Sequence, residues 1–116
     1  MLSQLNKKRQ TTNLTSNSEY LENTMSALII VDLTPTDREK LTAYSTQAAQ
    51  TLLAYGGEFL CKGPIEALHG NSPFSTKVVI QFPDRDSAVN WYSSKAYQEI
   101  IPVRELGMIS QFHLVG

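Results

Sequence analysis

The chain of 116 residues is 41% hydrophobic and 18% charged, which is typical of one soluble globular domain with a single core. Its formal net charge of -1 argues against nucleic acid or an anionic membrane as a partner, because no overall positive field attracts either. The single cysteine, Cys61, excludes an internal disulfide and agrees with a cytoplasmic location, and no apolar run is long enough to cross a membrane.

The N-terminal segment differs in character from the rest of the chain. Residues 1–24 are polar and have no sustained hydrophobic period. Their basic run, Lys7-Lys8-Arg9, is followed by Gln, Thr and Asn and not by the apolar segment of a secretory signal. We therefore expect residues 1–24 to be a flexible polar extension and residues 25–116 to be the folded domain.

The first predicted strand covers residues 27–33, where the run Ala-Leu-Ile-Ile-Val-Asp-Leu is almost continuously apolar. A helix is predicted from Thr36 to about Tyr55, because Thr36 and Glu39 have the spacing of a capping box. Gly56-Gly57 supplies the left-handed conformation that commonly ends a helix.

Two further strands are predicted next, at residues 58–62 and 77–82, with a short irregular segment at 65–70 between them. The later strand alternates, so that one set of side chains points toward a helix-covered core and the other set points away. The first set is Val78, Ile80 and Phe82, and the second is Lys77, Val79 and Gln81.

The C-terminal part is predicted to contain two helices and a last strand. Asp84 caps a helix that runs to about Ser93, and Ser94 caps a shorter helix that is interrupted near Pro102. Residues 109–115 form the closing strand.

The element order βαββαβ predicts an α+β protein, a ferredoxin-like sandwich with a four-stranded antiparallel sheet. Right-handed crossovers place both helices on one side of this sheet, so the other side is left bare. We expect the bare side to be covered by a second copy of the chain, giving a homodimer with a closed barrel around a partly polar interior. Its expected members are Leu28, Ile30, Asp32, Leu60, Lys62, Val79, Gln81, Ile109, Gln111 and His113.

From about Met25 to Gly116 the chain resembles a family of domains of unknown function in the dimeric α+β barrel superfamily. The matching motifs are Tyr55-Gly56-Gly57, the Gly63 turn, Leu68-x-Gly70, Phe82-Pro83, Ala88-x-x-Trp91-Tyr92-x-Ser94-x-x-Tyr97 and Arg104. The resemblance implies a ferredoxin-like protomer, a homodimer and no assigned activity. Relatives in the wider superfamily include cofactor-independent monooxygenases, haem-degrading enzymes, isomerases and chlorite-reacting enzymes, and membership alone does not choose among them.

Three positions depart from the family pattern. Lys62 stands where the family typically has Arg, and His69 and Gln81 stand where it typically has Glu. A guanidinium fork thus becomes a point charge, and two carboxylates become neutral or weakly basic groups. These changes argue against a mechanism that needs those two carboxylates as bases.

Three residues are candidates for moving protons. Asp32 either pairs with Lys62 or His113, with a raised pKa if it is enclosed, or caps the turn after its strand. His69 is either a proton shuttle or a solvated loop histidine. His113 is either a base or haem ligand, or a hydrogen-bonded histidine in a dimer seam.

Five residues are candidates for binding a ligand. Lys62 either binds a carboxylate or is an edge lysine in solvent, and Arg104 either clamps an oxyanion or ties its helix to a nearby carboxylate. Tyr44 either reaches the ligand or is a core aromatic with a wet tip. Trp91 and Tyr92 form either a pocket wall or a dimer anchor, and packing is favoured for Trp91. Gln81 joins them if it lines one cavity with Asp32, Lys62 and His113.

No other site motif is present. The two histidines and one cysteine lack the spacing of a zinc site, and no glycine-rich nucleotide loop follows a strand, so no metal and no cofactor are predicted. Two functions remain. One is a homodimer that binds a small organic ligand, anionic or aromatic, with cofactor-independent oxygenation or isomerisation as its chemistry if it is an enzyme. The other is a non-catalytic binding or assembly module.

Overall fold

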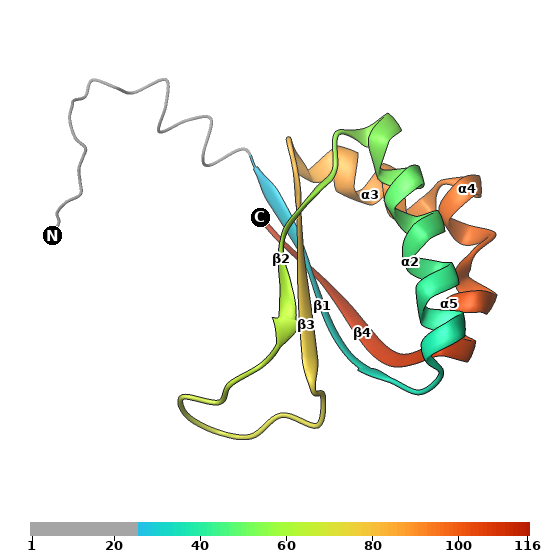
Figure 1. The fold of residues 1–116 in the computed structure, drawn as a ribbon. Coiled ribbons are helices and arrows are strands. Elements are labelled where there is room, and N and C mark those ends of the chain that lie inside the picture. The colour runs from blue at the N-terminus through green and yellow to red at the C-terminus, as the bar shows by residue number, and fades with distance from the viewer. Residues whose placement is uncertain (1–25) are drawn as a thin grey trace, which may run out of the picture.

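The computed structural model describes residues 26–116, so the expected extension at residues 1–24 lies outside the described part. Four strands and four α-helices follow one another along these residues (Figure 1). They are β1 (Ala27–Pro35), α2 (Arg38–Leu52), β2 (Glu58–Pro64), β3 (Thr76–Phe82), α3 (Arg85–Ser93), α4 (Lys95–Gln98), α5 (Ile101–Gly107) and β4 (Met108–Val115), with a 3₁₀ turn, η1 (Leu53–Tyr55), after α2.

The strands form one antiparallel sheet in the order β2-β3-β1-β4. All the helices lie on the same side of it, so the fold has two layers (Figure 1). This arrangement confirms the predicted ferredoxin-like α+β sandwich. It leaves β4 and β2 as edge strands and leaves one side of the sheet, the open face, uncovered by residues 26–116.

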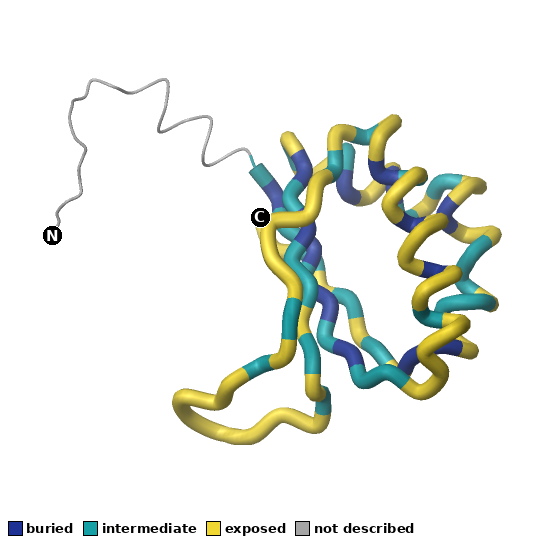
Figure 2. The backbone as a smooth tube through the Cα atoms, in the orientation of Figure 1, coloured by how far each residue is buried: buried dark blue, intermediate teal, exposed yellow. Residues whose placement is uncertain are grey.

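The core lies between the sheet and the helices, where Figure 2 shows the buried positions. On β1 the buried positions alternate with half-buried ones, as the period of a strand requires. The largest fully buried side chains are those of Phe82, Trp91 and Tyr97. Burying side chains of this size supplies the largest favourable contribution to folding.

The start of α2 differs from the prediction. Its N-cap is Asp37, whose carboxylate accepts a hydrogen bond from the Lys40 backbone nitrogen at 3.1 Å, so the capping box expected at Thr36 is wrong. Thr36 is engaged elsewhere, because its own backbone N–H donates to the Gly107 carbonyl at 2.9 Å. The helix gives way to the 3₁₀ turn after Leu52, and Gly56 then takes the left-handed conformation with φ 71°.

The caps predicted for the later helices are confirmed. Asp84 accepts a hydrogen bond from the Ser87 backbone, and Ser94 accepts one from the Tyr97 backbone. Pro102 lies in the first turn of α5, where a missing N–H costs nothing, so the predicted interruption separates two short helices.

The second strand contains an irregularity that the sequence did not reveal. Phe59 pairs with Ile80, but the next paired residue is Cys61, opposite Val79, so Leu60 is the extra residue of a β-bulge. A one-residue insertion reverses which side each later side chain faces. Lys62 therefore lies on the helix side, and its predicted place on the open face is wrong.

Candidate functional site

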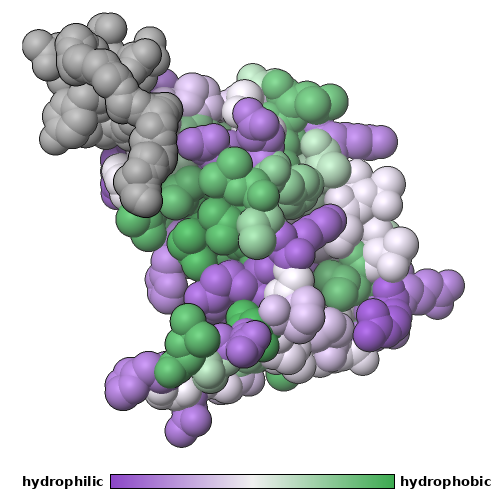
Figure 3. Space-filling view, turned by 60° about the vertical axis from the view of Figure 1, so that its left-hand side comes forward, coloured by the Kyte–Doolittle hydropathy of each residue, from purple (hydrophilic) through white to green (hydrophobic). Residues whose placement is uncertain are grey.

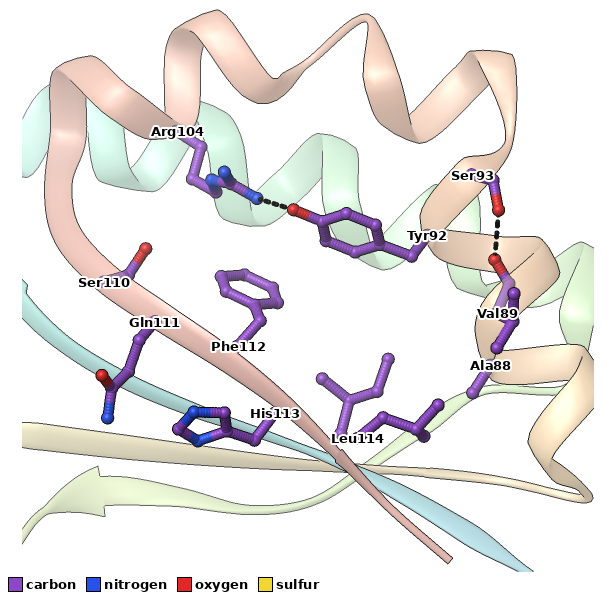
Figure 4. Close-up of a pocket in the computed structure, with 11 residues that line it drawn as sticks. Ala88, Val89, Tyr92, Ser93, Arg104, Ser110, Gln111, Phe112, His113 and Leu114 are labelled. Carbon is purple, nitrogen blue, oxygen red and sulfur yellow. Dashed lines mark hydrogen bonds between the residues drawn. The ribbon is translucent and has the colours of Figure 1, made fainter.

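A groove of about 410 Å³ lies between β4 and the helices α3 and α5, along the free edge of the sheet (Figure 4). Arg104 carries the one permanent charge among the described residues that line it, and none of these residues is Asp or Glu. The lining consists of Ile29, Ala88, Val89, Tyr92, Ser93, Arg104, Ser110, Gln111, Phe112, His113 and Leu114. The groove thus combines apolar walls with a single cation.

The Arg104 side chain is only 12% exposed and is held from several directions. Its Nη1 donates hydrogen bonds to the hydroxyls of Tyr92 at 3.1 Å and Tyr97 at 3.0 Å, and its Nε donates to Glu105 at 3.0 Å. Its guanidinium carbon lies 4.8 Å from the centroid of the Phe112 ring. Within residues 26–116 its second terminal nitrogen, Nη2, has no hydrogen-bond acceptor, so this donor is left for another partner.

Two buried tyrosines extend this contact into a cluster of Arg104, Tyr92, Tyr97 and Tyr44, which we call the tyrosine–arginine cluster. The hydroxyls of Tyr97 and Tyr44 are 2.7 Å apart. Burial raises the pKa of both tyrosines, and for Tyr97 the opposing hydrogen bonds do not cancel this effect. Both hydroxyls therefore stay protonated at neutral pH and position Arg104 without acting as bases.

The charge of Arg104 is secure in this environment. Desolvation acts to lower its pKa, but the hydrogen bonds to Tyr92 and Tyr97 outweigh it, so the pKa lies above its usual range. A buried cation of this kind needs hydrogen-bonded partners, and the cluster supplies them.

Local structure explains how these side chains meet. Ser94 donates from its hydroxyl to the Trp91 carbonyl at 2.7 Å and accepts from the Tyr97 backbone at 3.2 Å, so it joins the end of α3 to the start of α4. Tyr92 and Tyr97 thus flank one tight turn. Pro102 then starts α5, which brings Arg104 back beside both rings.

The predicted candidates do not share one cavity. Asp32 lies on the open face, where it accepts hydrogen bonds from Lys77 at 3.1 Å and Gln111 at 3.2 Å, so its ion-pair partner is Lys77 and not Lys62. Desolvation acts to raise the pKa of Asp32, but the bonds from Gln111 and Lys77 together bring it below its usual range. The raised pKa expected for an enclosed Asp32 does not occur in this chain.

Lys62 lines a second, inner cavity of about 60 Å³ between the sheet and α2. Its Nζ lies 4.9 Å from the centroid of the Phe59 ring. Tyr44 and Trp91 line the same cavity, and Trp91 is 1% exposed, as expected for a core residue. The full lining is Val31, Leu33, Leu41, Tyr44, Ser45, Ala48, Leu52, Phe59, Lys62, Val78, Ile80, Trp91, Met108 and Phe112.

The remaining candidates lie apart from one another. His113 lines the groove, from the side of β4 that also carries Gln111 (Figure 4). Gln81 lines a separate depression of about 180 Å³ with Glu58. His69 is exposed in the loop between β2 and β3, and it lines neither the groove nor the inner cavity. Of the eight candidates, Arg104 and His113 both line the groove, but His113 pairs with Ile30 and so lies on the open-face side of the sheet, whereas Arg104 lies on the helix side. The inner cavity brings together Tyr44, Lys62 and Trp91.

Two residues at these sites, Tyr97 and Phe112, were not proposed as site residues from the sequence, whereas Tyr92 was expected, with Trp91, in a pocket wall or a dimer anchor. The motif Trp91-Tyr92-x-Ser94-x-x-Tyr97 singled out Tyr97 only as part of a resemblance. The hydroxyls of Tyr92 and Tyr97 meet Arg104 across a helix–helix contact that no local spacing encodes. Phe112 was visible as an apolar residue in the last strand, and nothing in its neighbourhood distinguished it from core.

The open face combines apolar and polar side chains (Figure 3). Figure 3 looks toward the left side of Figure 1 and shows an apolar patch bordered by polar groups. Ile109 is 62% exposed and Val115 is 53% exposed on this side of β4, while the Asp32–Lys77 ion pair lies near its centre. Cys61 also faces this side, opposite Val79, and is exposed.

Residues 26–116 contain no group of three or more His, Cys, Asp or Glu side chains placed to hold a metal ion. No helix among them has the length and apolar character needed to cross a membrane.

Several solved structures share this fold. A protein of unknown function from Rhodopseudomonas palustris is 14% identical, with a TM-score of 0.66, over 89% of this chain and 93% of that one. SnoaB, a cofactor-independent oxygenase from Streptomyces nogalater, is 10% identical, with a TM-score of 0.59, over 79% of this chain and 92% of that one. A dimeric ferredoxin-like protein of unknown function from Thermobifida fusca is 9% identical, with a TM-score of 0.56, over 79% and 91%. Identities this low establish the fold alone.

Sequence comparison gives the family. No curated protein sequence matches the chain. The model of one protein family does match, over residues 26–116, which is the whole of the part that the structure describes. The chain therefore belongs to the family described as Domain of unknown function (DUF1330).

Proposed function

We propose that the protein is a homodimer in which each protomer binds a small organic molecule with an anionic group in the groove beside β4. The observation that carries this proposal is the state of Arg104. It is a nearly buried cation whose Nη2 has no acceptor within residues 26–116, in a groove whose described lining includes no carboxylate. An anionic ligand is the partner that such a site favours.

The partners that Arg104 already has do not satisfy it. The carboxylate of Glu105 is 60% exposed, and an ion pair open to solvent contributes little. The two tyrosine hydroxyls are neutral and share a single nitrogen of the guanidinium. A ligand carboxylate or phenolate at Nη2 would gain a charge-assisted hydrogen bond in a partly desolvated place.

The walls of the groove indicate the rest of the ligand. Tyr92 and Phe112 present aromatic rings 5.8 Å apart, and Leu114 and Val89 add apolar surface. The hydroxyl hydrogen of Tyr92 has no acceptor within residues 26–116, because its oxygen serves only as the acceptor from Arg104. These features suit a flat or apolar organic acid, whose charge lies at Arg104 and Tyr92.

If the groove carries out a reaction, its residues support cofactor-independent proton transfer or oxygenation of an electron-rich substrate. His113 is the one imidazole among the described residues that line the groove, and it reaches the groove from the open-face side of β4, so it is the proton acceptor that we propose. Asp32 is engaged by Lys77 and Gln111, and His69 lies in an exposed loop, which makes both weaker choices.

The homodimer rests on the open face. Its apolar side chains include some that are more than half exposed, and a second copy of the same sheet would cover them. A protein of the same fold from Thermobifida fusca is described as dimeric, which supports this arrangement. Sedimentation should give a dimer at micromolar concentration, and a stable monomer would contradict the proposal.

Ligand binding can be tested by thermal shift with matched compounds. Benzoate should raise the melting temperature, whereas benzamide, its neutral analogue, should raise it much less, because a ligand that binds only the native state stabilises it. Quinones and haem extend the screen to other classes. Arg104→Gln should weaken benzoate binding about tenfold or more, which is the loss of one charge-assisted hydrogen bond.

A matched control is available. Arg85 is exposed and donates to the Gly116 carbonyl at 2.8 Å outside the groove, so Arg85→Gln removes the same charge without changing the site. Equal loss in both variants would mean that net charge, and not the groove, governs binding. The absence of any shift across the whole screen would overturn the proposed function.

A non-catalytic assembly module is the second candidate, and one observation favours it. Asp32, Lys77 and Gln111 satisfy one another on the open face, as expected for a polar network that sets the register of two sheets. This function predicts a stable dimer together with no response to any ligand class. The sedimentation and thermal-shift measurements therefore separate the two candidates.

A further inference from the structure

The groove and the inner cavity have one side chain in common. Among the residues of 26–116 that line them, Phe112 alone belongs to both sets. It is half-buried on the helix side of β4, and Figure 4 shows its ring between the strand and Arg104. The groove is open to solvent, and the inner cavity lies between the sheet and α2, with the exposed Phe59 and Lys62 in its lining.

The two spaces differ in chemistry. The groove contains Arg104, whose free nitrogen favours an anion. The inner cavity is lined mainly by aliphatic and aromatic side chains, and Tyr44, Ser45 and Lys62 add polar groups. A ligand that occupied both would have a charged head and an apolar body.

We propose that the groove and the inner cavity are two halves of one site for an amphipathic organic anion, with the Phe112 ring as the movable partition between them. This rests on the proposed function, in that the charged head occupies the groove at Arg104. The apolar body passes the position of the Phe112 ring and enters the inner cavity. Phe112 is then the residue that sets how large a body the site admits.

The volumes require the partition to move. An apolar cavity of about 150 Å³ takes up benzene, and the inner cavity has a volume of about 60 Å³, so it is too small for a ring while Phe112 stays in place. Displacing the ring adds its volume to the cavity and joins the two spaces.

The contacts of Phe112 explain how an anion favours this movement. The ring lies 4.8 Å from the Arg104 guanidinium, its centroid lies 5.8 Å from that of Tyr92 and 6.5 Å from that of Tyr97, and it also packs against the hydrophobic core. A cation that is neutralised by an anion attracts an aromatic face less strongly. Binding of the charged head at Arg104 therefore weakens the contact that holds the Phe112 ring, so the ring can move aside for the apolar body.

The chain has a single tryptophan, Trp91, which lines the inner cavity and not the groove. Its fluorescence therefore reports access to the inner cavity. In the wild-type protein Trp91 is 1% exposed, so acrylamide should quench it weakly. Phe112→Ala should raise the acrylamide quenching constant several-fold. The quenching constant of iodide should rise more than that of caesium, because the opened path passes the positive charge of Arg104.

The control is Leu114→Ala, which removes apolar volume from the groove but does not line the inner cavity. It should leave quenching at the wild-type value. Near-ultraviolet circular dichroism shows whether each variant keeps its native packing. If Phe112→Ala does not fold, Phe112→Leu should still give a smaller rise, and a folded variant with unchanged quenching overturns the proposal.

The ligand arm uses 4-phenylbutyrate and butyrate, which share a carboxylate and differ in the ring. In Phe112→Ala, phenylbutyrate should occupy the opened path and return quenching toward the wild-type value, whereas butyrate should not. Equal protection by both compounds would refute an apolar body in the inner cavity. The quenching measurement needs no ligand, so unchanged quenching in Phe112→Ala shows that Phe112 is not a partition. Failure of the proposed function gives a different result, in which no anion binds to the wild-type protein.

Discussion

Tyr97→Phe is the substitution that tests the tyrosine–arginine cluster most directly. It removes one oxygen from a ring that is completely buried, so the apolar packing stays the same. That oxygen accepts a hydrogen bond from Arg104 at 3.0 Å and lies 2.7 Å from the Tyr44 hydroxyl. Arg104 keeps Tyr92 as an acceptor on the same nitrogen, but the buried Tyr44 hydroxyl loses the one partner it has within residues 26–116.

The magnitude follows from these partners. A buried hydrogen bond contributes about 1 kcal/mol when neutral and about 1.5–3 kcal/mol when one partner is charged. Leaving a buried hydroxyl unpaired adds a desolvation penalty of about 1–3 kcal/mol. Because Arg104 is partly compensated by Tyr92, we expect Tyr97→Phe to lower the free energy of unfolding by about 2–3 kcal/mol.

Urea unfolding of four proteins measures this effect: the wild type, Tyr44→Phe, Tyr97→Phe and the double variant. The slope of the free energy against urea concentration should not change, because the same surface is exposed on unfolding. The sum of the stability losses of the two single variants should exceed the loss of the double variant by about 1 kcal/mol, since both substitutions break the same hydrogen bond. A loss below about 0.5 kcal/mol for Tyr97→Phe, or strict additivity, would refute the cluster as described.

Four further predictions concern other parts of the molecule. Trp91→Ala should cost about 3–5 kcal/mol in urea unfolding, because the side chain is core, and a near-neutral result would show that it is not packed as described. Gly107→Ala should cost about 1–3 kcal/mol, because the new Cβ would lie 2.7 Å from the Leu41 backbone nitrogen, whereas Gly63→Ala, with no atom within 4 Å, serves as a control that should be nearly neutral. The folded-state pKa of Asp32 is lowered, so its contribution to stability is complete above the ordinary aspartate pKa of about 4 and is lost as the pH falls through the lower folded-state value. As the pH falls over that acid range, Asp32→Asn should therefore lose less stability than the wild type, as measured by urea unfolding at each pH. Parallel curves of unfolding free energy against pH for the two proteins would contradict the ion pair with Lys77. A chain that starts at Met25 should unfold and sediment like the full chain, and reduced stability would show that residues 1–24 belong to the fold.

The strand positions were readable from the sequence because they depend on local patterns. The continuous apolar run of β1 is typical of a buried strand, the alternation along β3 reflects the two-residue period of a strand, and Asp84 and Ser94 cap helices through bonds to residues three positions later. Thr36 also has the local pattern of a helix cap, yet Asp37 is the N-cap of α2. The Thr36 backbone bonds to Gly107 in α5, and a contact across 71 positions outweighed the local motif.

The candidate site was harder to foresee because it depends on which side of the sheet each residue faces. Lys62 was placed correctly in its strand but on the wrong side, since the bulge at Leu60 reverses the alternation beyond it. Arg104 was identified as an oxyanion ligand or as a tie between its helix and a carboxylate. The structure pairs it with Glu105 of the same helix, bonds it to Tyr92 and Tyr97, and gives its Nη2 no acceptor within residues 26–116. Its tyrosine partners could not be found by spacing alone.

By itself, the sequence determined the order of the elements, and through it the sheet order and the single helical layer, because hydrophobic period, caps and crossover handedness act locally or by general rule. Only the tertiary structure decided that Tyr44, Tyr97 and Arg104 meet, that Asp32 pairs with Lys77, and that Phe112 lines both the groove and the inner cavity. These contacts join segments far apart in the chain, and their geometry depends on the packing of whole elements and on a one-residue bulge that no local pattern records.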